Sequence, residues 1–242
     1  MPATEPASGA ASALRTWKTP PLHPITAESF AIIDREFGPH QLPPAEYAIL
    51  RRIIHTTADF DYRHRLQVSE GAIAAGLAAL QAQTPIIVDV TMVQQGIRGL
   101  VQQTFQNPIL SAIDQAPPLE QEAAASARTA PPRTAPTRTA QGILHCIAQY
   151  PQAIYVIGNA PTALLALGEQ ISLGLAQPAL VIAAPVGFVS VVESKAAIAA
   201  QTVPQIRVAG RKGGSTVAAA IVNALVMLAC PEPVGLPSPA RQ

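Results

Sequence analysis

Residues 210–216 (GRKGGST) hold the side chains best suited to binding a charged ligand. Glycines let a ligand come close to the backbone, and the two neighbouring cations attract an anion. The segment is not a Walker A phosphate loop, because the Gly-x-x-x-x-Gly-Lys-Ser order is missing. Its composition fits a carboxylate or phosphate site, and it fits a solvated turn as well.

Residues 158–162 (GNAPT) form a second candidate loop, between an expected strand and the helix that follows it. Unpaired N–H groups and the helix dipole at such a point suit an anion such as a carboxylate. A tight turn in which the Asn159 side chain caps the helix is the alternative. Taken alone, the loop favours the turn.

His55 lies near the end of an amphipathic segment (LRRIIHTT), and Asp59 and Asp61 follow it closely. A histidine at this position commonly pairs with the helix C-terminus or is a satisfied buried group. The sequence shows no partnered Ser/His/Asp set, no paired carboxylates in an obvious pocket loop and no Gly-x-Gly-x-x-Gly fingerprint. Residue type and spacing alone therefore do not identify His55 as a catalyst.

A further loop, residues 185–188 (PVGF), is apolar and suits one wall of a pocket. Glu193 and Lys195 follow it, and we expect them on the solvated face of a helix.

Helices and strands that alternate along the chain must position these loops. Apolar spacing predicts helices at 27–37, 44–56, 71–82, 141–149, 161–176, 192–200 and 215–228, and strands at 85–90, 153–157, 179–184 and 205–208. Continuous aliphatic strands between helices predict an α/β fold with a mostly parallel sheet covered on both faces. Ligands of such sheets bind beyond the carboxyl ends of the strands, where the candidate loops lie.

We expect one folded domain at 22–230, between two tails. Residues 1–21 and 231–242 are rich in proline and small residues without a period, which is typical of disorder. Within the domain, Arg-Thr-Ala occurs three times at a five-residue interval, which marks residues 127–138 as a low-complexity surface loop. Its arginines could bind a partner, although a solvated insertion is the simpler interpretation.

The overall composition excludes several classes of protein. The formal net charge is +1, so no strong field favours nucleic acid or an anionic membrane. Cys146 and Cys230 lie outside any ligand spacing, which argues against a disulfide framework or a structural zinc site. Neither a signal peptide nor an apolar stretch long enough for a transmembrane helix is evident. We therefore expect a soluble cytoplasmic protein.

Several longer motifs carry a resemblance to a known family. They are HPITAESFAIID, RRIIHTTADFDY, PIIVDVTMVQQGI, TRTAQGI, VIGNAPTALLAL, PVGFVSVVESK and AGRKGGSTVAAA, in this order between His23 and about Ala229. In these motifs the chain resembles the precorrin-8X methylmutases, also called cobalt-precorrin-8 methylmutases. VIGNAPTAL and PVGFV-x-x-x-ESK are the most specific of them.

The resemblance implies a reaction and an architecture. The family moves a methyl group from C11 to C12 of a tetrapyrrole, converting precorrin-8X to hydrogenobyrinate, or the cobalt-containing substrate to cobyrinate. Since the rearrangement is intramolecular, no cofactor, methyl donor or protein-bound metal is implied. The implied fold is a three-layer α/β/α arrangement, usually a homodimer with active sites near the subunit interface.

The resemblance also assigns roles to residues. His55 matches the family histidine, which would hydrogen-bond or protonate a ring nitrogen and so lower the barrier to the methyl shift. Apolar loops around Met92 and at 186–188 would face the ring. The substrate's carboxylate arms would lie against Ser29, Arg138, Asn159, Thr162, Arg211, Lys212, Gly213, Gly214 and Ser215.

Arg138 is chosen from the three repeated arginines, where the family has a single Thr-Arg-Ser/Thr before the helix. Arg138 follows Thr137 and leads directly into the predicted helix. Arg128 and Arg133 are each followed by a proline three residues later, which obstructs a helix.

Three other functions compete with the methylmutase. A corrinoid carrier would bind the product, without turnover, for channelling to a neighbouring pathway enzyme. A phosphate- or nucleotide-binding module could use the loop at 211–215, but both nucleotide fingerprints are missing. RNA binding by the arginine repeat is disfavoured, because no aromatic stacking platform accompanies the charges.

Overall fold

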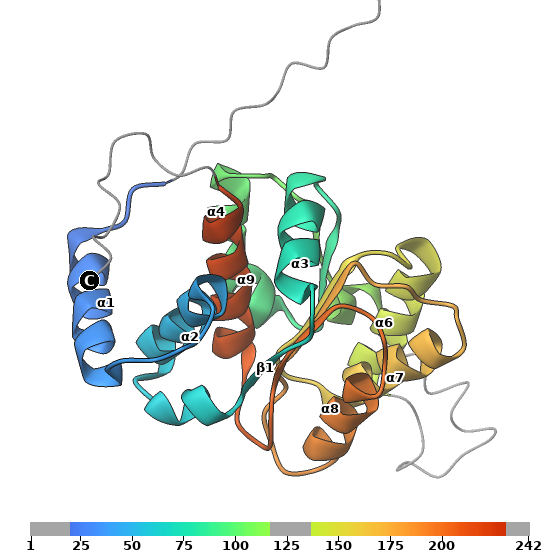
Figure 1. Cartoon of the computed structure of the whole chain (residues 1–242). Coiled ribbons are helices and arrows are strands. Elements are labelled where there is room, and N and C mark those ends of the chain that lie inside the picture. The colour runs from blue at the N-terminus through green and yellow to red at the C-terminus, as the bar shows by residue number, and fades with distance from the viewer. Residues whose placement is uncertain (1–19, 117–136, 231–242) are drawn as a thin grey trace, which may run out of the picture.

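A computed structural model of the chain describes residues 20–116 and 137–230. In this part of the chain a single sheet of six strands lies between two groups of helices (Figure 1). The strands are β1 (Leu66–Val68), β2 (Ile86–Val88), β3 (Ile109–Ser111), β4 (Ile154–Ile157), β5 (Leu180–Ala183) and β6 (Gln205–Val208). The helices are α1 (Pro24–Phe37), α2 (Pro44–Thr57), η1 (Phe60–His64), α3 (Ala72–Gln81), α4 (Thr91–Gln103), η2 (Ala112–Gln115), α6 (Arg138–Gln149), α7 (Pro161–Ser172), α8 (Val191–Ala199) and α9 (Ser215–Ala229).

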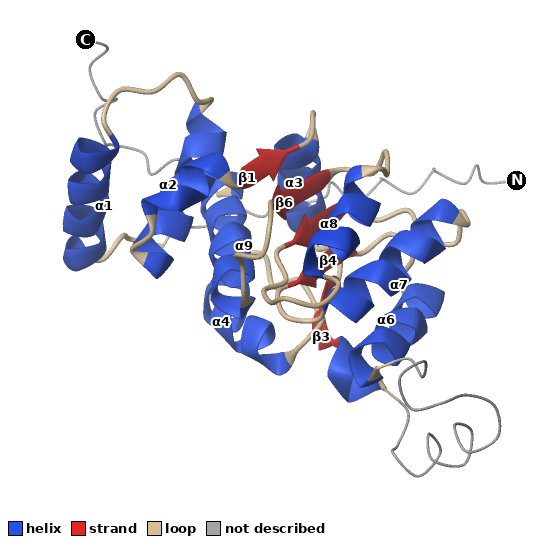
Figure 2. Ribbon diagram, turned by 90° about the horizontal axis from the view of Figure 1, so that it is seen from below, coloured by secondary structure: helices blue, strands red, loops and turns tan. Residues whose placement is uncertain are grey.

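The strand order is β1-β6-β5-β4-β2-β3, and every neighbouring pair is parallel except β1 with β6. Helices α2, α3, α4 and α9 contribute to one apolar layer, and α6, α7 and α8 to the other. Figure 2 shows the strands between α4 and α9 on one side and α6 and α7 on the other. The predicted three-layer α/β/α fold with a mostly parallel sheet is confirmed.

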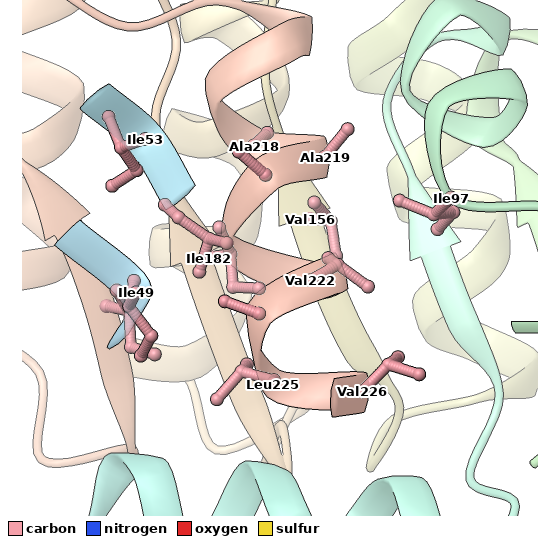
Figure 3. Close-up of a cluster of buried hydrophobic side chains, with 14 of the residues drawn as sticks. Ile49, Ile53, Ile97, Val156, Ile182, Ala218, Ala219, Val222, Leu225 and Val226 are labelled. Carbon is pink, nitrogen blue, oxygen red and sulfur yellow. The ribbon is translucent and has the colours of Figure 1, made fainter. Parts of the chain in front are cut away.

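The strands divide their side chains between the two layers. Val156 and Ile182 point toward α9, whereas Tyr155 and Val181 belong to the layer of α6 to α8. All four side chains are fully buried, which explains why the strands read as continuous apolar runs. Ile49 and Ile53 of α2 and Ile97 of α4 pack around α9 in the first layer (Figure 3).

Small residues let the helices of this layer approach closely. A Cβ placed on Gly96 of α4 would lie 2.8 Å from the Cβ of Ala219 in α9. The Asn223 amide, also on α9, donates to the Gly96 carbonyl oxygen at 2.9 Å. The aliphatic, alanine-rich composition thus serves tight packing of α4 on α9.

Prolines at the first position and left-handed residues at the last turn fix where several helices begin and end. Pro24 and Pro44 occupy the first position of α1 and α2, where a missing N–H costs nothing. The backbone of Ala58 turns left-handed and ends α2, and its N–H donates to Ile54. Gly174, also left-handed, follows α7, which ends at Ser172 and so is shorter than the predicted helix at 161–176.

Helix α4 and strands β1 and β3 were not predicted from the sequence. In α4 only Val93, Ile97 and Val101 are buried, so apolar residues are sparse among glutamines. Strands β1 and β3 lie at the edges of the sheet and have three residues each, too few for a clear alternation. None of the described helices is long and apolar enough to cross a membrane.

Candidate functional site

The loops after β4, β5 and β6 meet at the carboxyl end of the sheet. The Gly214 N–H, after β6, donates to the Ala184 carbonyl oxygen after β5 at 2.8 Å. The Gly187 N–H donates to the carbonyl oxygen of Arg211 at 3.2 Å. A side chain on Gly158, after β4, would collide with the backbone of Ser215 at the start of α9. The two candidate loops from the sequence are therefore neighbours, as the topology predicted.

The glycines of the loop after β6 are required by its backbone. Gly213 has a φ of 149° and Gly214 a φ of 121°, values that favour glycine. A Cβ on Gly213 would overlap the carbonyl oxygen of Ala184. Only a residue without a side chain lets this loop lie against the end of β5.

Lys195 of α8 holds the same loop from inside the protein. Its side chain is only 3 % exposed, and its ammonium donates to the carbonyl oxygens of Gly210 and Lys212 at 2.8 Å each. Burial lowers the pKa of Lys195 to about 8. In a trans peptide the N–H points opposite to the C=O, so the amides of Arg211 and Gly213 point away from Lys195. The expectation of a solvated Lys195 is wrong, because the loop folds over it.

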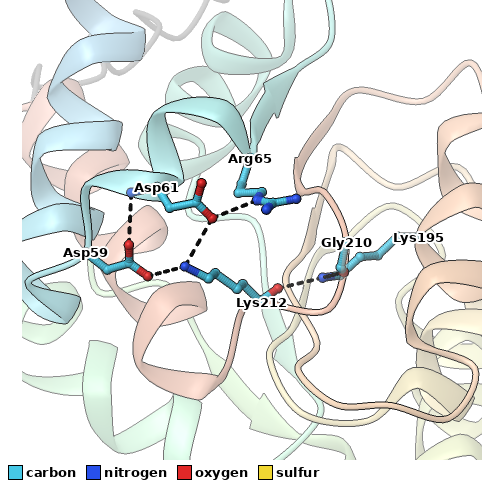
Figure 4. A network of polar contacts seen from close by, with 6 residues as sticks. All are labelled: Asp59, Asp61, Arg65, Lys195, Gly210 and Lys212. Atoms are coloured by element: carbon cyan, nitrogen blue, oxygen red, sulfur yellow. Dashed lines mark hydrogen bonds and ion pairs between the residues drawn. The ribbon is translucent and has the colours of Figure 1, made fainter.

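Lys212 is held by acidic side chains of the chain itself. Its ammonium lies 2.6 Å from a carboxylate oxygen of Asp59 and 3.1 Å from one of Asp61 (Figure 4). Asp61 also pairs with Arg65 at 2.9 Å. The hydrogen bond from Lys212 lowers the pKa of Asp59, and those from Arg65 and Lys212 lower that of Asp61. This network ties the loop after β6 to the segment that follows α2.

Arg211 differs from Lys212 in that no acidic partner for it occurs in the described part of the chain. Its side chain is exposed, and the guanidinium carbon lies 5.5 Å from the centre of the Phe188 ring. Phe188 and Val189 are themselves more than 80 % exposed, at 83 % and 81 %. A cation beside uncovered apolar side chains suits a ligand that carries both a carboxylate and a large apolar ring.

His55 and Ser29 lie in the α1–α2 pair, on the α9 side of the sheet. His55 is exposed in the last turn of α2, four residues before Asp59. Its ring makes an edge-to-face contact with Phe30 of α1, with 5.3 Å between the ring centres. The hydroxyl of Ser29, next to Phe30, donates to the Ile25 carbonyl oxygen at 2.8 Å. His55 therefore lies near the end of α2, and the segment that follows this end contacts the loop after β6 through Asp59.

Arg138 and Thr162 come together on the other face of the sheet. Arg138 is the first residue of α6, and the Thr137 side chain caps that helix by accepting from the Ala140 N–H. The Thr137 and Thr162 hydroxyl oxygens are 2.7 Å apart, which joins the beginnings of α6 and α7. The helix therefore begins at Arg138, three residues before the start of the predicted helix at 141–149. Arg128 and Arg133 lie outside the described residues.

Asp89 is the residue that sequence reasoning missed. It follows β2, is fully buried, and accepts the N–H groups of Gly158, Asn159 and Ala160 at 3.0, 2.7 and 2.7 Å. Burial raises the pKa of Asp89, and the three amide donors act against that rise. A single acidic residue inside the apolar run PIIVDV was the available signal, because a buried carboxylate needs donors.

Asp89 changes the interpretation of the loop after β4. The three amides that could have bound a ligand anion already bind an internal one. Ala160 is the N-cap of α7 and no side chain caps it, so the expected Asn159 cap is wrong. Asn159 and Thr162 remain exposed, and their side chains are the groups that this loop offers to solvent.

The described residues hold no cluster of three or more His, Cys, Asp or Glu side chains suited to a metal ion. What the site offers is hydrogen bonds and positive charge. The arrangement can hold an anionic ligand at Arg211 and Arg138 and lend or accept a proton at His55.

Known proteins resemble this chain over most of its length. The sequence model of the precorrin-8X methylmutase family matches residues 24–228. A cobalt-precorrin-8 methylmutase of Synechocystis sp. is 53% identical over 221 residues, which are 86% of this chain and 96% of the relative. A precorrin-8X methylmutase of Pseudomonas aeruginosa is 37% identical over 205 residues, with 83% and 93% covered.

A solved structure agrees with these relatives. The crystal structure of a precorrin-8X methylmutase from Thermus thermophilus superposes with a TM-score of 0.76 and is 41% identical. The match covers 85% of this chain and 95% of that one.

Proposed function

This chain belongs to the precorrin-8X methylmutase family of isomerases, and we propose that it moves a methyl group from C11 to C12 of a tetrapyrrole. The product is hydrogenobyrinate from precorrin-8X, or cobyrinate from the cobalt-containing substrate. The observation that carries the proposal is the family match, which spans both candidate loops and His55. The relatives described above are named as methylmutases, which supports turnover over a carrier role.

His55 is proposed as the proton-lending group. Its imidazole is exposed, and Phe30 is its one aromatic neighbour among the described residues, so we expect a ring nitrogen to be accessible to a substrate. A hydrogen bond or proton given to a macrocycle nitrogen draws electron density from the ring and lowers the barrier to the shift. An imidazole has one nitrogen that can donate a proton and one that can accept it, so it can lend a proton and recover it.

The carboxylate arms are proposed to bind at the loops around the strand ends. Arg211 supplies the exposed charge. Gly213, Gly214 and Ser215 lie beside it at the start of α9, where the Gly214 N–H already donates to Ala184 and helps to fix the loop. Lys212 acts there mainly by fixing the loop, because Asp59 and Asp61 engage its ammonium.

Other residues complete the proposed substrate site. Arg138 and Thr162 share one surface on the other face of the sheet, beside Asn159, and Ser29 lies next to the aromatic contact of His55. The ring would lie against Met92, Val186 and Phe188, whose side chains are 66 %, 46 % and 83 % exposed.

The cobalt-containing substrate is the preferred candidate, since the Synechocystis relative that is 53% identical is named for it. A homodimer, a cytoplasmic location and channelling of the product to the next corrin enzyme remain predictions from the family resemblance.

The test follows the absorbance of both substrates after addition of purified protein. We expect conversion to the corrin spectrum, with His55→Ala abolishing turnover but leaving pigment binding. His145→Ala, an exposed histidine on α6, is the matched control and should retain activity. Normal turnover by His55→Ala would refute the role of His55. Product binding by the wild type without conversion of either substrate would favour the carrier.

A further inference from the structure

The outward face of α2 carries more than His55. Arg51 and Arg52 lie three and four residues after Ala48 and four and three residues before His55, so all four share one side of the helix. Their neighbours at Ile49 and Ile53 are fully buried and face the core. Of these four residues His55 is exposed, and Ala48, Arg51 and Arg52 are partly buried.

A cleft of about 220 Å³ runs along this face, between α1, α2 and α9. Leu22, Phe30, Met227 and Leu228 are among its apolar walls, and Arg51 and Arg52 are its charged residues. This volume is smaller than that of a site for a whole drug-sized ligand, and it suits one short arm of a larger ligand. Apolar walls around a few polar groups are the usual character of such a site.

The two arginines differ in what they contact. Arg51 pairs with Asp34 at 2.9 Å, and its guanidinium carbon lies 4.4 Å from the centre of the Phe30 ring. Arg52 has no acidic partner and no hydrogen bond within residues 20–116 and 137–230. It is nevertheless half-buried, and that burial lowers its pKa. A desolvated guanidinium without a counter-ion is unfavourable, and an anion in the cleft would relieve it.

The cleft lies close to the proposed catalytic residue, which is not one of its lining residues. Phe30 forms part of its wall and touches the ring of His55 at the same time. Arg52 and His55 are three residues apart on one helix, a spacing that places their β-carbons about 5–6 Å apart. A ligand whose ring lies at His55 could therefore extend a short arm to Arg52.

We propose that this cleft binds one carboxylate arm of the tetrapyrrole, with Arg52 as its counter-ion. The assignment rests on the proposed function and adds a binding residue to it. The macrocycle is then held from two sides of His55. Arg52 binds an arm along α2, and the loop after β6 binds another beyond the end of that helix.

The test measures affinity for the corrin product, hydrogenobyrinate or cobyrinate, by absorbance titration, so that no turnover is needed. We expect Arg52→Gln to weaken binding about tenfold or more, and Arg52→Lys to keep most of the affinity because the charge remains. The product with its arms methyl-esterified should bind wild type and Arg52→Gln alike. Arg98→Gln, an exposed arginine on α4, is the control and should bind normally.

Equal product affinity in wild type and Arg52→Gln would overturn the assignment. If the wild type converts substrate and Arg52→Gln binds product normally, the proposed role of the cleft is wrong and the proposed function stands. A wild type that neither binds nor converts the pigments contradicts the proposed function itself.

Discussion

At the scale of single residues, buried charges define which groups remain for the substrate. Both carboxylate oxygens of Asp89 accept hydrogen bonds from the amides just before α7. The ammonium of Lys195 donates to two carbonyl oxygens of the loop after β6. Both lie inside the protein, so each acts by holding a loop in one conformation. Arg211 and His55 stay exposed, which is consistent with their proposed roles in binding and catalysis.

Replacing Asp89 tests the first of these roles. Asp89→Ala leaves three N–H groups without their acceptor, and we expect the free energy of unfolding to fall by about 3 kcal/mol or more. Asp89→Asn should be milder, because one amide oxygen can still accept. Urea denaturation followed by circular dichroism measures both. An Asp89→Ala protein as stable as the wild type would show that the amides find other acceptors.

At the scale of elements, the loop after β6 is held by three different parts of the fold. Helix α8 holds it from inside through Lys195, and the end of β5 fits against Gly213. The segment after α2 holds it through Asp59 and Asp61. Because α2 also carries His55, these ion pairs connect the helix of the proposed catalytic group to the loop after β6.

The lowered pKa of Lys195 makes the stability of the fold depend on pH. The pKa falls from an ordinary 10.5 to about 8 in the folded protein, so the unfolded chain binds more protons between these values. Folding stability should therefore rise with pH from about 8 to 10.5, relative to Lys195→Met. A neutral amine still has two N–H donors for the two carbonyls. Urea denaturation of both proteins at pH 7 and pH 10 measures the difference, and a pH-independent difference would contradict it.

At the scale of the whole molecule, an exposed apolar surface follows β5. Val186, Phe188, Val189 and Val192 are each 46 % or more exposed, beside the proposed ring-binding region. Such groups on a globular protein commonly mark an interface. The family resemblance predicts a homodimer with active sites near its interface, and this surface is our candidate for that contact.

A charged residue in this surface tests the dimer. We expect the wild type to elute at twice the mass of one chain in size-exclusion chromatography with light scattering. Val189→Glu should shift it toward the single-chain mass, since an unpaired charge is costly in an apolar interface. Leu173→Glu, at another exposed apolar residue after α7, should leave the mass unchanged. A wild type of single-chain mass would refute the dimer.

The sequence by itself determined the alternation of strands and helices, and hence the parallel sheet and the edge at which the loops gather. Aliphatic runs such as IYVI and LVIA are fully buried on both faces, and this requirement is visible in composition alone. The motifs around His55 and the loop at 210–216 also identified the family. The short edge strands and the glutamine-rich α4 were not predicted, because their apolar residues are too few to form a clear pattern. Contacts with neighbouring elements stabilise them.

Only the tertiary structure decided which polar side chains are free. Lys212 and Arg211 are adjacent and similar in charge, yet Asp59 and Asp61 engage Lys212 while Arg211 stays exposed. Arg51 and Arg52 differ in the same way through Asp34. Their partners lie far enough along the chain, or on another element, that spacing gives no hint of them. A charge is neutralised by whatever the fold brings within a few ångströms, and that distance is a property of packing.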